Sequence, residues 1–196
     1  MKPIHITLSI LICFCSCLKI DAFPKQIMIV RHAEKFANAY DKTPFVTNGL
    51  TLKGNERATA LAPYFMADPK LTKFGPPVAV YATTPDENYE SLRPLETALP
   101  TAAALKLGVQ QRSNEAAMVK EILENPSYDG KNVLLCWEHV RISNIVKALG
   151  VSPLPKPWPY AVFDWVYRIE LDDNGKVSTF EILPQKLMYG DSETVS

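Results

Sequence analysis

The chain has 196 residues, of which 47% are hydrophobic and 21% are charged, which is typical of one globular domain with a substantial core. Its 21 lysines and arginines are balanced by 21 aspartates and glutamates. Because this balance leaves no basic field to attract nucleic acid or an anionic membrane surface, we expect no nucleic-acid partner, and any affinity for phosphate must be local.

The first 22 residues, 1–22, have the pattern of a secretory signal peptide. Lys2 and His5 lie at the start of the chain, the stretch from Ile4 to Cys17 contains almost no charge, and polar residues return from Lys19. The apolar stretch is shorter than the about 20 residues that a membrane-spanning helix needs. We therefore expect export to the periplasm or the medium and no stable membrane span. A buried N-terminal helix is the alternative interpretation.

Two cleavage positions compete in this segment. Cleavage after Ala22 would release a soluble protein, whereas cleavage before Cys17 would leave a lipid anchor on that cysteine; we favour the first, because Phe14 is a poor lipobox residue. Loss of the segment also removes Cys13 and Cys15. Cys136 is then the only thiol, so we expect no disulfide in the mature chain.

Strand-like and helix-like patterns alternate through the next part of the chain. Continuous apolar runs predict strands buried on both faces of a parallel sheet, at 26–30, 78–82 and 132–137. Apolar residues at helical spacing predict helices, which begin at Thr51, near Arg93-Pro94, at Ser113 or Asn114 and after His139. Pro100 predicts that the second helix is kinked or begins later than Pro94.

The C-terminal part predicts a β-hairpin, because 164–171 and 177–183 flank the turn sequence Asp-Asp-Asn-Gly. A proline-rich link precedes it, and we expect 186–196 to form a frayed C-terminal tail. These patterns together predict an α/β fold: a three-layer α/β/α sandwich with a mostly parallel sheet and the hairpin at its edge. The catalytic domain is expected at 23–185.

Two histidines follow strand-like runs, each beside another charged residue. Arg31-His32 follows the first run, and Glu138-His139 follows the run at 132–137. Ligands of open α/β sheets bind outside the carboxyl ends of the strands, so both histidines are expected at one edge of the sheet. One histidine in such a place is more often structural than catalytic, but two beside arginines favour a site.

Four short blocks of residues also occur in order along the chain. They are Arg31-His32-Ala33-Glu34, Leu52-x-Gly54-x-x-Arg57-Ala58, Ser91-x-Arg93-x-x-Glu96-Thr97-Ala98, and His139 at the start of a helix. In these blocks the chain resembles the histidine phosphatase superfamily, in its phosphoglycerate mutase-like branch, over roughly residues 26–150. It departs from the usual pattern at Ala33, where glycine is commonest, and this leaves the imidazole and the guanidinium unchanged.

The resemblance implies a phosphoric monoester hydrolase in which His32 is the nucleophile. A neutral imidazole nitrogen would attack phosphorus in line, and water would then hydrolyse the phosphohistidine. We expect a backbone carbonyl to fix the other ring nitrogen. No metal and no cofactor are expected, since guanidinium and imidazole groups supply the positive charge. Glu34 and Glu138 are further candidates for orienting the loop or the substrate.

The resemblance also assigns roles to the other site residues. Arg31 and Arg93 would hold the phosphoryl oxygens, and Arg57 would do the same unless it lies on a solvated helix face. His139 would stabilise the charge that grows in the transition state. Glu115 is the candidate general acid, with an ordinary helix-start charge as the equal alternative.

Three functions fit these residues. The favoured one is an exported phosphatase that acts on a small phosphomonoester or a related phosphoryl compound. A phosphoglycerate mutase-like phosphoryl transferase is disfavoured by export and by short lids, since only Lys35 to Gly49 and Tyr64 to Pro77 could cover the site. A non-catalytic module that binds a phosphorylated ligand is disfavoured by the presence of both histidines and the arginines. The sequence leaves the substrate and the oligomeric state open.

Overall fold

The computed structural model describes residues 23–36, 48–87 and 90–195. The predicted signal peptide, its cleavage positions and the possible lipid anchor at Cys17 therefore lie outside the described residues, as does most of the stretch from Lys35 to Gly49. Within the described ranges, no helix is both long enough and apolar enough to cross a membrane.

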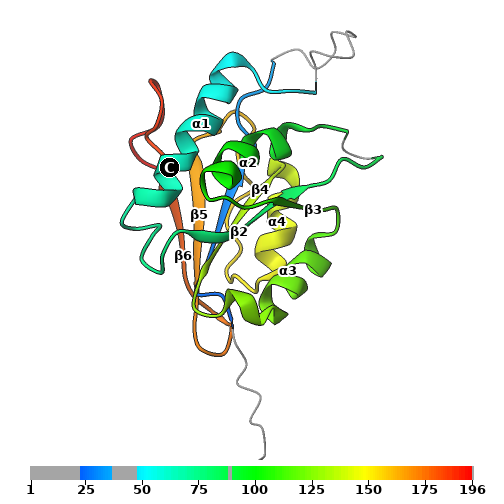
Figure 1. Ribbon diagram of the computed structural model, residues 1–196, viewed down its shortest axis with the longest axis vertical. Helices are drawn as coiled ribbons and strands as arrows, with labels where there is room; N and C mark the ends of the chain where they lie inside the picture. The colour runs from blue at the N-terminus through cyan, green and yellow to red at the C-terminus, as the bar shows by residue number, and fades with distance from the viewer. Residues whose placement is uncertain (1–22, 37–47, 88–89, 196) are drawn as a thin grey trace, which may run out of the picture.

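A six-stranded sheet in the order β3-β2-β4-β1-β5-β6 forms the middle of the molecule. Its strands are β1 (Gln26–Arg31), β2 (Pro77–Thr83), β3 (Val109–Arg112), β4 (Asn132–Trp137), β5 (Trp165–Leu171) and β6 (Val177–Pro184). The first four are mutually parallel, β5 is antiparallel to β1, and β6 is antiparallel to β5. Figure 1 shows the β5–β6 hairpin at one edge and β3 at the other. The mostly parallel sheet with the hairpin at its edge is therefore confirmed, and β3 is a strand that the sequence did not predict.

Four α-helices and a short 3₁₀ helix connect the strands. They are α1 (Leu52–Ala67), α2 (Arg93–Ala104), α3 (Glu115–Glu124), η1 (Pro126–Tyr128) and α4 (His139–Ala148). The hydroxyl of Thr51 caps α1, and the side chain of Asn114 caps α3, as expected for an unpaired first turn. The α2 helix begins at Arg93 and keeps Pro100 in its interior, so the later start considered from the sequence is wrong.

The sheet separates two apolar cores. Alternate residues of β1 point to opposite faces, as in any strand. Ile27 and Ile29 pack with residues of α3 and α4, whereas Met28 and Val30 pack with residues of α1 and α2. All four side chains are buried, each contributing about 1.5–3 kcal/mol relative to an exposed one. The three-layer α/β/α arrangement is therefore confirmed.

The stretch from Tyr64 to Pro77 lies away from the edge where the histidines lie. The side-chain amides of Gln26 and Asn132 both donate hydrogen bonds to the carbonyl of Leu71, at 2.8 and 2.9 Å. These two residues are the first of β1 and β4, so the stretch is anchored at the amino ends of the parallel strands. Its expected use as a lid over the site is therefore wrong.

Residues 186–195 form neither helix nor strand, but they are not the frayed tail that the sequence suggested. Asp191 forms an ion pair of 2.6 Å with Arg57 of α1, and the Ser192 backbone N–H donates to Asp164. The segment runs beside α1, at the red end of the ribbon in Figure 1. Carboxylates bonded to distant partners fix this part of the chain, which apolar periodicity cannot reveal.

Candidate active site

His32 lies at the carboxyl end of the central strand pair. Residues of β1 and β4 align in parallel up to Arg31 opposite Trp137, and the His32 backbone N–H donates to the Trp137 carbonyl at 2.9 Å. His139, two residues after Trp137, is the first residue of α4. The structure thus brings both histidines to one edge of the sheet.

The His32 ring is held in one tautomer. Its Nδ1 lies 2.7 Å from the Ala33 carbonyl oxygen, and because a carbonyl only accepts, Nδ1 carries the proton and Nε2 the lone pair. The side chain is 2% exposed. Burial lowers the pKa of His32 well below 6.5. The hydrogen bond to Ala33 acts in the opposite direction, and the charges of Arg31, Arg93 and His139 lower the pKa further. The ring is therefore neutral at pH 7 and can act as a nucleophile.

Arg31 is fixed by the segment that precedes β5. Its Nη1 donates to the carbonyl oxygens of Tyr160 and Val162, at 2.5 and 3.0 Å. The centroid of the Phe163 ring lies 3.9 Å from the guanidinium carbon of Arg31, so the two groups stack. Sequence reasoning missed these residues, because the segment follows a proline-rich stretch and has no periodicity.

Arg93 and the loop of residues 32–34, the candidate nucleophile loop, are both bonded to Thr97 of α2. The Thr97 hydroxyl accepts from the Ala33 backbone N–H at 2.9 Å and donates to the Arg93 carbonyl at 2.8 Å. Arg93 itself is buried, and its charge helps to lower the pKa of His32. Thr97 therefore links Arg93 to the loop that carries His32.

His139 presents an unsatisfied ring nitrogen. Its Nδ1 is buried and, among the described residues, has no hydrogen-bond partner. The ring packs edge-on against Tyr160, with 5.6 Å between ring centroids. Burial lowers the pKa of His139 to about 4, helped by Arg31 and Lys35. A buried polar atom without a partner is costly, so this nitrogen suits an oxygen of a bound ligand.

Arg57 does not have the role that the sequence suggested. All five of its N–H groups are directed at side chains of the protein. Nε and Nη2 donate to Glu34, Nη1 donates to Gln185, and both Nη atoms donate to Asp191. No donor is left for a phosphoryl oxygen, so Arg57 is removed from the phosphate-binding set. Glu34, a candidate for orienting the substrate, is likewise engaged with Arg57.

Gly54 in the same block allows α1 to approach the nucleophile loop. A Cβ atom at this position would lie 2.4 Å from the Glu34 carbonyl oxygen, well inside van der Waals contact. The Glu34 carbonyl also accepts from the Thr51 backbone N–H at 3.0 Å. The glycine is thus required by close packing of two backbones.

Three carboxyl groups surround the guanidinium of Arg141. Glu115 lies 2.5 Å from its Nε, Asp86 3.1 Å from Nη1 and Glu138 3.3 Å from Nε. Glu115 also accepts from the indole N–H of Trp137 at 2.9 Å. Burial raises the pKa of Glu138 to about 7 against the pull of Arg141, with Asp86 and Glu115 adding to the rise. Sequence reasoning missed Arg141.

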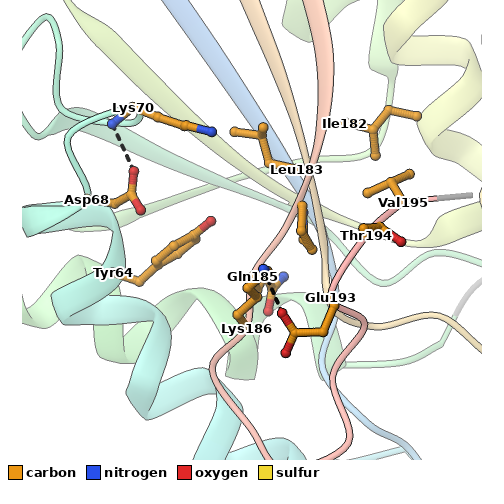
Figure 2. A pocket seen from close by; sticks show the side chains of 11 residues that line it. Tyr64, Asp68, Lys70, Ile182, Leu183, Gln185, Lys186, Glu193, Thr194 and Val195 are labelled. Atoms are coloured by element: carbon orange, nitrogen blue, oxygen red, sulfur yellow. Dashed lines mark hydrogen bonds and ion pairs between the residues drawn. The ribbon is translucent and has the colours of Figure 1, made fainter.

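A hollow of about 620 Å³ lies on the flank of the molecule, away from these residues. Figure 2 shows it between Tyr64 and Asp68, strand β6 and the C-terminal segment. Two of the charged side chains that line it, Lys186 and Glu193, form an ion pair of 2.7 Å with each other. None of the candidate catalytic residues lines it. Across the described residues no group of three or more His, Cys, Asp or Glu side chains is arranged to hold a metal ion.

Comparisons with known proteins agree with this architecture. The SixA protein histidine phosphatase complexed with tungstate matches with a TM-score of 0.56 and 17% identity, over 82% of this chain and 97% of that one. A mycobacterial glucosyl-3-phosphoglycerate phosphatase matches with a TM-score of 0.53 and 10% identity, over 82% and 97%. The phosphoglycerate mutase from Plasmodium falciparum matches with a TM-score of 0.52 and 15% identity, over 89% and 98%.

The chain therefore shares the fold of these solved phosphatases and of the phosphoglycerate mutase, which is the fold that the resemblance of its four sequence blocks implied. No family model and no curated protein sequence matches the chain. Because the identities to the solved structures are low, the likeness establishes the fold, and the chemistry has to be argued from the site itself.

Proposed function

We propose that the protein is a phosphatase that hydrolyses a small phosphomonoester through a phosphohistidine on His32. One observation supports this most directly: the Nδ1 contact with the Ala33 carbonyl leaves the Nε2 lone pair of a buried, neutral imidazole as the nucleophile. Arg31 and Arg93 lie close enough to influence its pKa. Two matched phosphatase structures contain tungstate or inorganic phosphate, which suits an oxyanion site of this kind.

In the proposed reaction, Nε2 of His32 attacks phosphorus while the bond from phosphorus to the leaving oxygen breaks. Arg31 and Arg93 balance the charge on the phosphoryl oxygens, and His139 bonds one of them. The leaving oxygen takes a proton from a carboxyl group and departs as an alcohol. Water then gives a proton to the same carboxylate and attacks the phosphohistidine, and the bond from phosphorus to Nε2 breaks. Inorganic phosphate leaves, and both His32 and the carboxyl group return to their neutral forms.

We further propose that the proton comes from the carboxyl cluster around Arg141. Glu115 was the candidate from sequence, and it accepts hydrogen bonds from Trp137 and lies against Arg141. Glu138 has the longest of the three contacts with Arg141, and its pKa of about 7 lets it hold a proton at neutral pH. Glu138 is therefore the better donor, and Glu115 is the alternative.

The proposal is tested by screening residues 23–196 against phosphomonoesters, phosphoproteins and phosphoanhydrides, with chelator present throughout. We expect turnover of an aryl phosphate with release of inorganic phosphate. Transfer of the phosphoryl group to a second hydroxyl of the substrate would instead indicate a mutase, and binding without turnover would indicate a phospho-ligand module. Export remains our proposal from the pattern of residues 1–22, and fractionation of cells expressing the full chain checks it.

A further inference from the structure

Lys35 is an additional cation beside the candidate site. It follows the nucleophile loop, is half-buried, and its Nζ lies 4.6 Å from the centroid of the Tyr160 ring. Among the described residues, no carboxylate pairs with it. The same Tyr160 ring packs against His139, so the ammonium group lies beside the site, and its charge contributes to the lowered pKa of His139.

Tyr160 provides a surface next to this cation. Its side chain is 62% exposed, although its ring packs on His139 and its carbonyl holds Arg31. A hydrogen bond from Lys35 lowers the pKa of the Tyr160 hydroxyl, with smaller contributions from Arg31 and Arg93. The guanidinium carbon of Arg31 lies 5.7 Å from the centroid of the same ring. An exposed aromatic ring beside a lysine offers an apolar face and a positive charge to the same ligand.

We propose that Lys35 and Tyr160 form a subsite for a leaving group that carries its own negative charge, either a carboxylate or a second phosphate. The proposal rests on the phosphatase function proposed above. A phosphomonoester carries about two negative charges at pH 7, which Arg31 and Arg93 balance. Lys35 is then available for a further anionic group. The flat face of Tyr160 would contact the carbon skeleton next to it.

The test compares aryl phosphates that differ only in charge. Carboxyphenyl phosphate and its neutral isostere, carbamoylphenyl phosphate, are assayed with wild-type protein, Lys35→Met and Lys73→Met. Lys73 pairs with Glu170, so Lys73→Met is the matched control. We expect wild type and Lys73→Met to have a KM about three- to fivefold lower for the carboxylate, and Lys35→Met to lose this preference, a size usual for one part-exposed charge pair.

Equal preference in Lys35→Met and wild type would overturn the subsite. The corresponding phosphonates, which cannot be hydrolysed, give the same comparison by calorimetry and separate failure of the subsite from failure of the proposed hydrolysis. A second comparison measures the turnover of pyrophosphate and of phenyl phosphate. A preference for pyrophosphate that depends on Lys35 identifies a phosphate as the second anion. A preference for carboxyphenyl phosphate that depends on Lys35 identifies a carboxylate.

A separate observation concerns the C-terminal segment, which contacts both sides of the site. On one side, Asp191 and Gln185 bind Arg57, and Arg57 binds both carboxylate oxygens of Glu34 at 3.0 and 3.1 Å through Nε. Glu34 lies two residues after His32. The side chains of Arg57 and Asp191 are only 2% and 4% exposed, so this network is almost completely shielded from solvent.

On the other side, Gln185 binds the segment that supports Arg31. Its backbone N–H donates to the Asp164 carbonyl at 2.7 Å, and its Nε2 donates to the Trp165 carbonyl at 3.0 Å. Asp164 follows Phe163, whose ring lies against the Arg31 guanidinium. The Arg57–Glu34 network on one side of the proposed phosphate site and the segment that holds Arg31 on the other side are therefore both bonded to one stretch of chain, 185–192.

We infer that Gln185 and Asp191 are positioning residues that hold the nucleophile loop against the Arg31 side of the site. Breaking a buried charge pair by removing one partner leaves an uncompensated charge, and Arg57 would then shift toward Glu34. A displacement of about 1 Å in a reacting group can cost about a hundredfold in rate. The inference rests on the proposed function.

Asp191→Asn tests this positioning role. We expect a folded protein at 25 °C whose kcat is at least tenfold lower, with KM changed less than threefold, and partial recovery in Asp191→Glu. Asp173→Asn, which removes an exposed ion pair with Lys25 at the opposite edge, is the control and should keep wild-type kcat. Gln185→Ala removes no charge and replaces Asp191→Asn if that variant does not fold.

A folded Asp191→Asn or Gln185→Ala protein with wild-type kcat would overturn the positioning role. Calorimetry with inorganic phosphate reports on the same pocket without turnover. If wild type binds phosphate without hydrolysing any ester, the proposed function fails, whereas a variant that keeps its phosphate affinity within threefold of wild type while its kcat falls supports the positioning role.

Discussion

His32→Ala is expected to reduce turnover of any phosphomonoester by about 10⁴-fold or more, because the variant has no atom to accept the phosphoryl group. Arg31, Arg93 and His139 would still bind the substrate, so phosphate affinity should change far less than kcat. The side chain occupies a buried position at the end of β1. Thermal unfolding must therefore be measured alongside the rate.

The same variant tests for the intermediate. Rapid acid-free quenching of the wild-type reaction with radiolabelled substrate should trap a phosphoenzyme that is stable in alkali and labile in acid, as expected for phosphorus bonded to nitrogen. His139→Ala keeps the nucleophile, so it should still be labelled but at a rate about a hundredfold lower. Labelling of His32→Ala at the wild-type level would disprove the assignment of the nucleophile.

The structural features that were predicted from the sequence have local signals. The apolar runs at 26–30 and 132–137 are each followed two residues later by a histidine, and parallel strands end at the same edge of the sheet. The backbone carbonyl expected to fix the His32 ring is that of Ala33, its immediate neighbour. Thr51 and Asn114 cap helices through residues three positions away. Each of these features depends on short stretches of chain.

The features that were missed depend on contacts between distant residues. Arg57 and Asp191 are 134 positions apart, and Arg31 and the Tyr160 carbonyl 129. A single sequence has no signal for such pairs, so Arg57 was assigned to phosphate by motif alone. Strand β3 was missed because its residues, Val-Gln-Gln-Arg, are half-exposed and too polar to form an apolar run.

For substrates with poor leaving groups, kcat/KM is expected to fall as pH rises above about 7. Glu138, with its pKa raised to about 7, must be protonated to act as an acid, and its protonated fraction falls about tenfold per pH unit above the pKa. His32 has a pKa lowered well below 6.5. The nucleophile is therefore already neutral throughout this range, and only the acid limits the rate on the alkaline side.

Glu138→Gln and Glu115→Gln distinguish the two possible donors. If Glu138 is the donor, Glu138→Gln should lose about 10²- to 10³-fold with alkyl phosphates and lose the alkaline limb. With 4-nitrophenyl phosphate, whose leaving oxygen needs no proton, the loss should stay below about tenfold. The opposite pattern, with the leaving-group dependence confined to Glu115→Gln, would assign the proton to Glu115.

The arrangement around Arg141 favours the first outcome. One guanidinium cannot neutralise three carboxylates at a partly buried site, so one of them is expected to keep a proton. Glu115 has two short contacts, with the indole N–H of Trp137 and with Arg141, and Asp86 has one contact of 3.1 Å with Arg141. Glu138 has the longest contact and lies beside His139 at the start of α4. The proton should therefore reside on the carboxyl group that is adjacent in the chain to a phosphate-binding histidine.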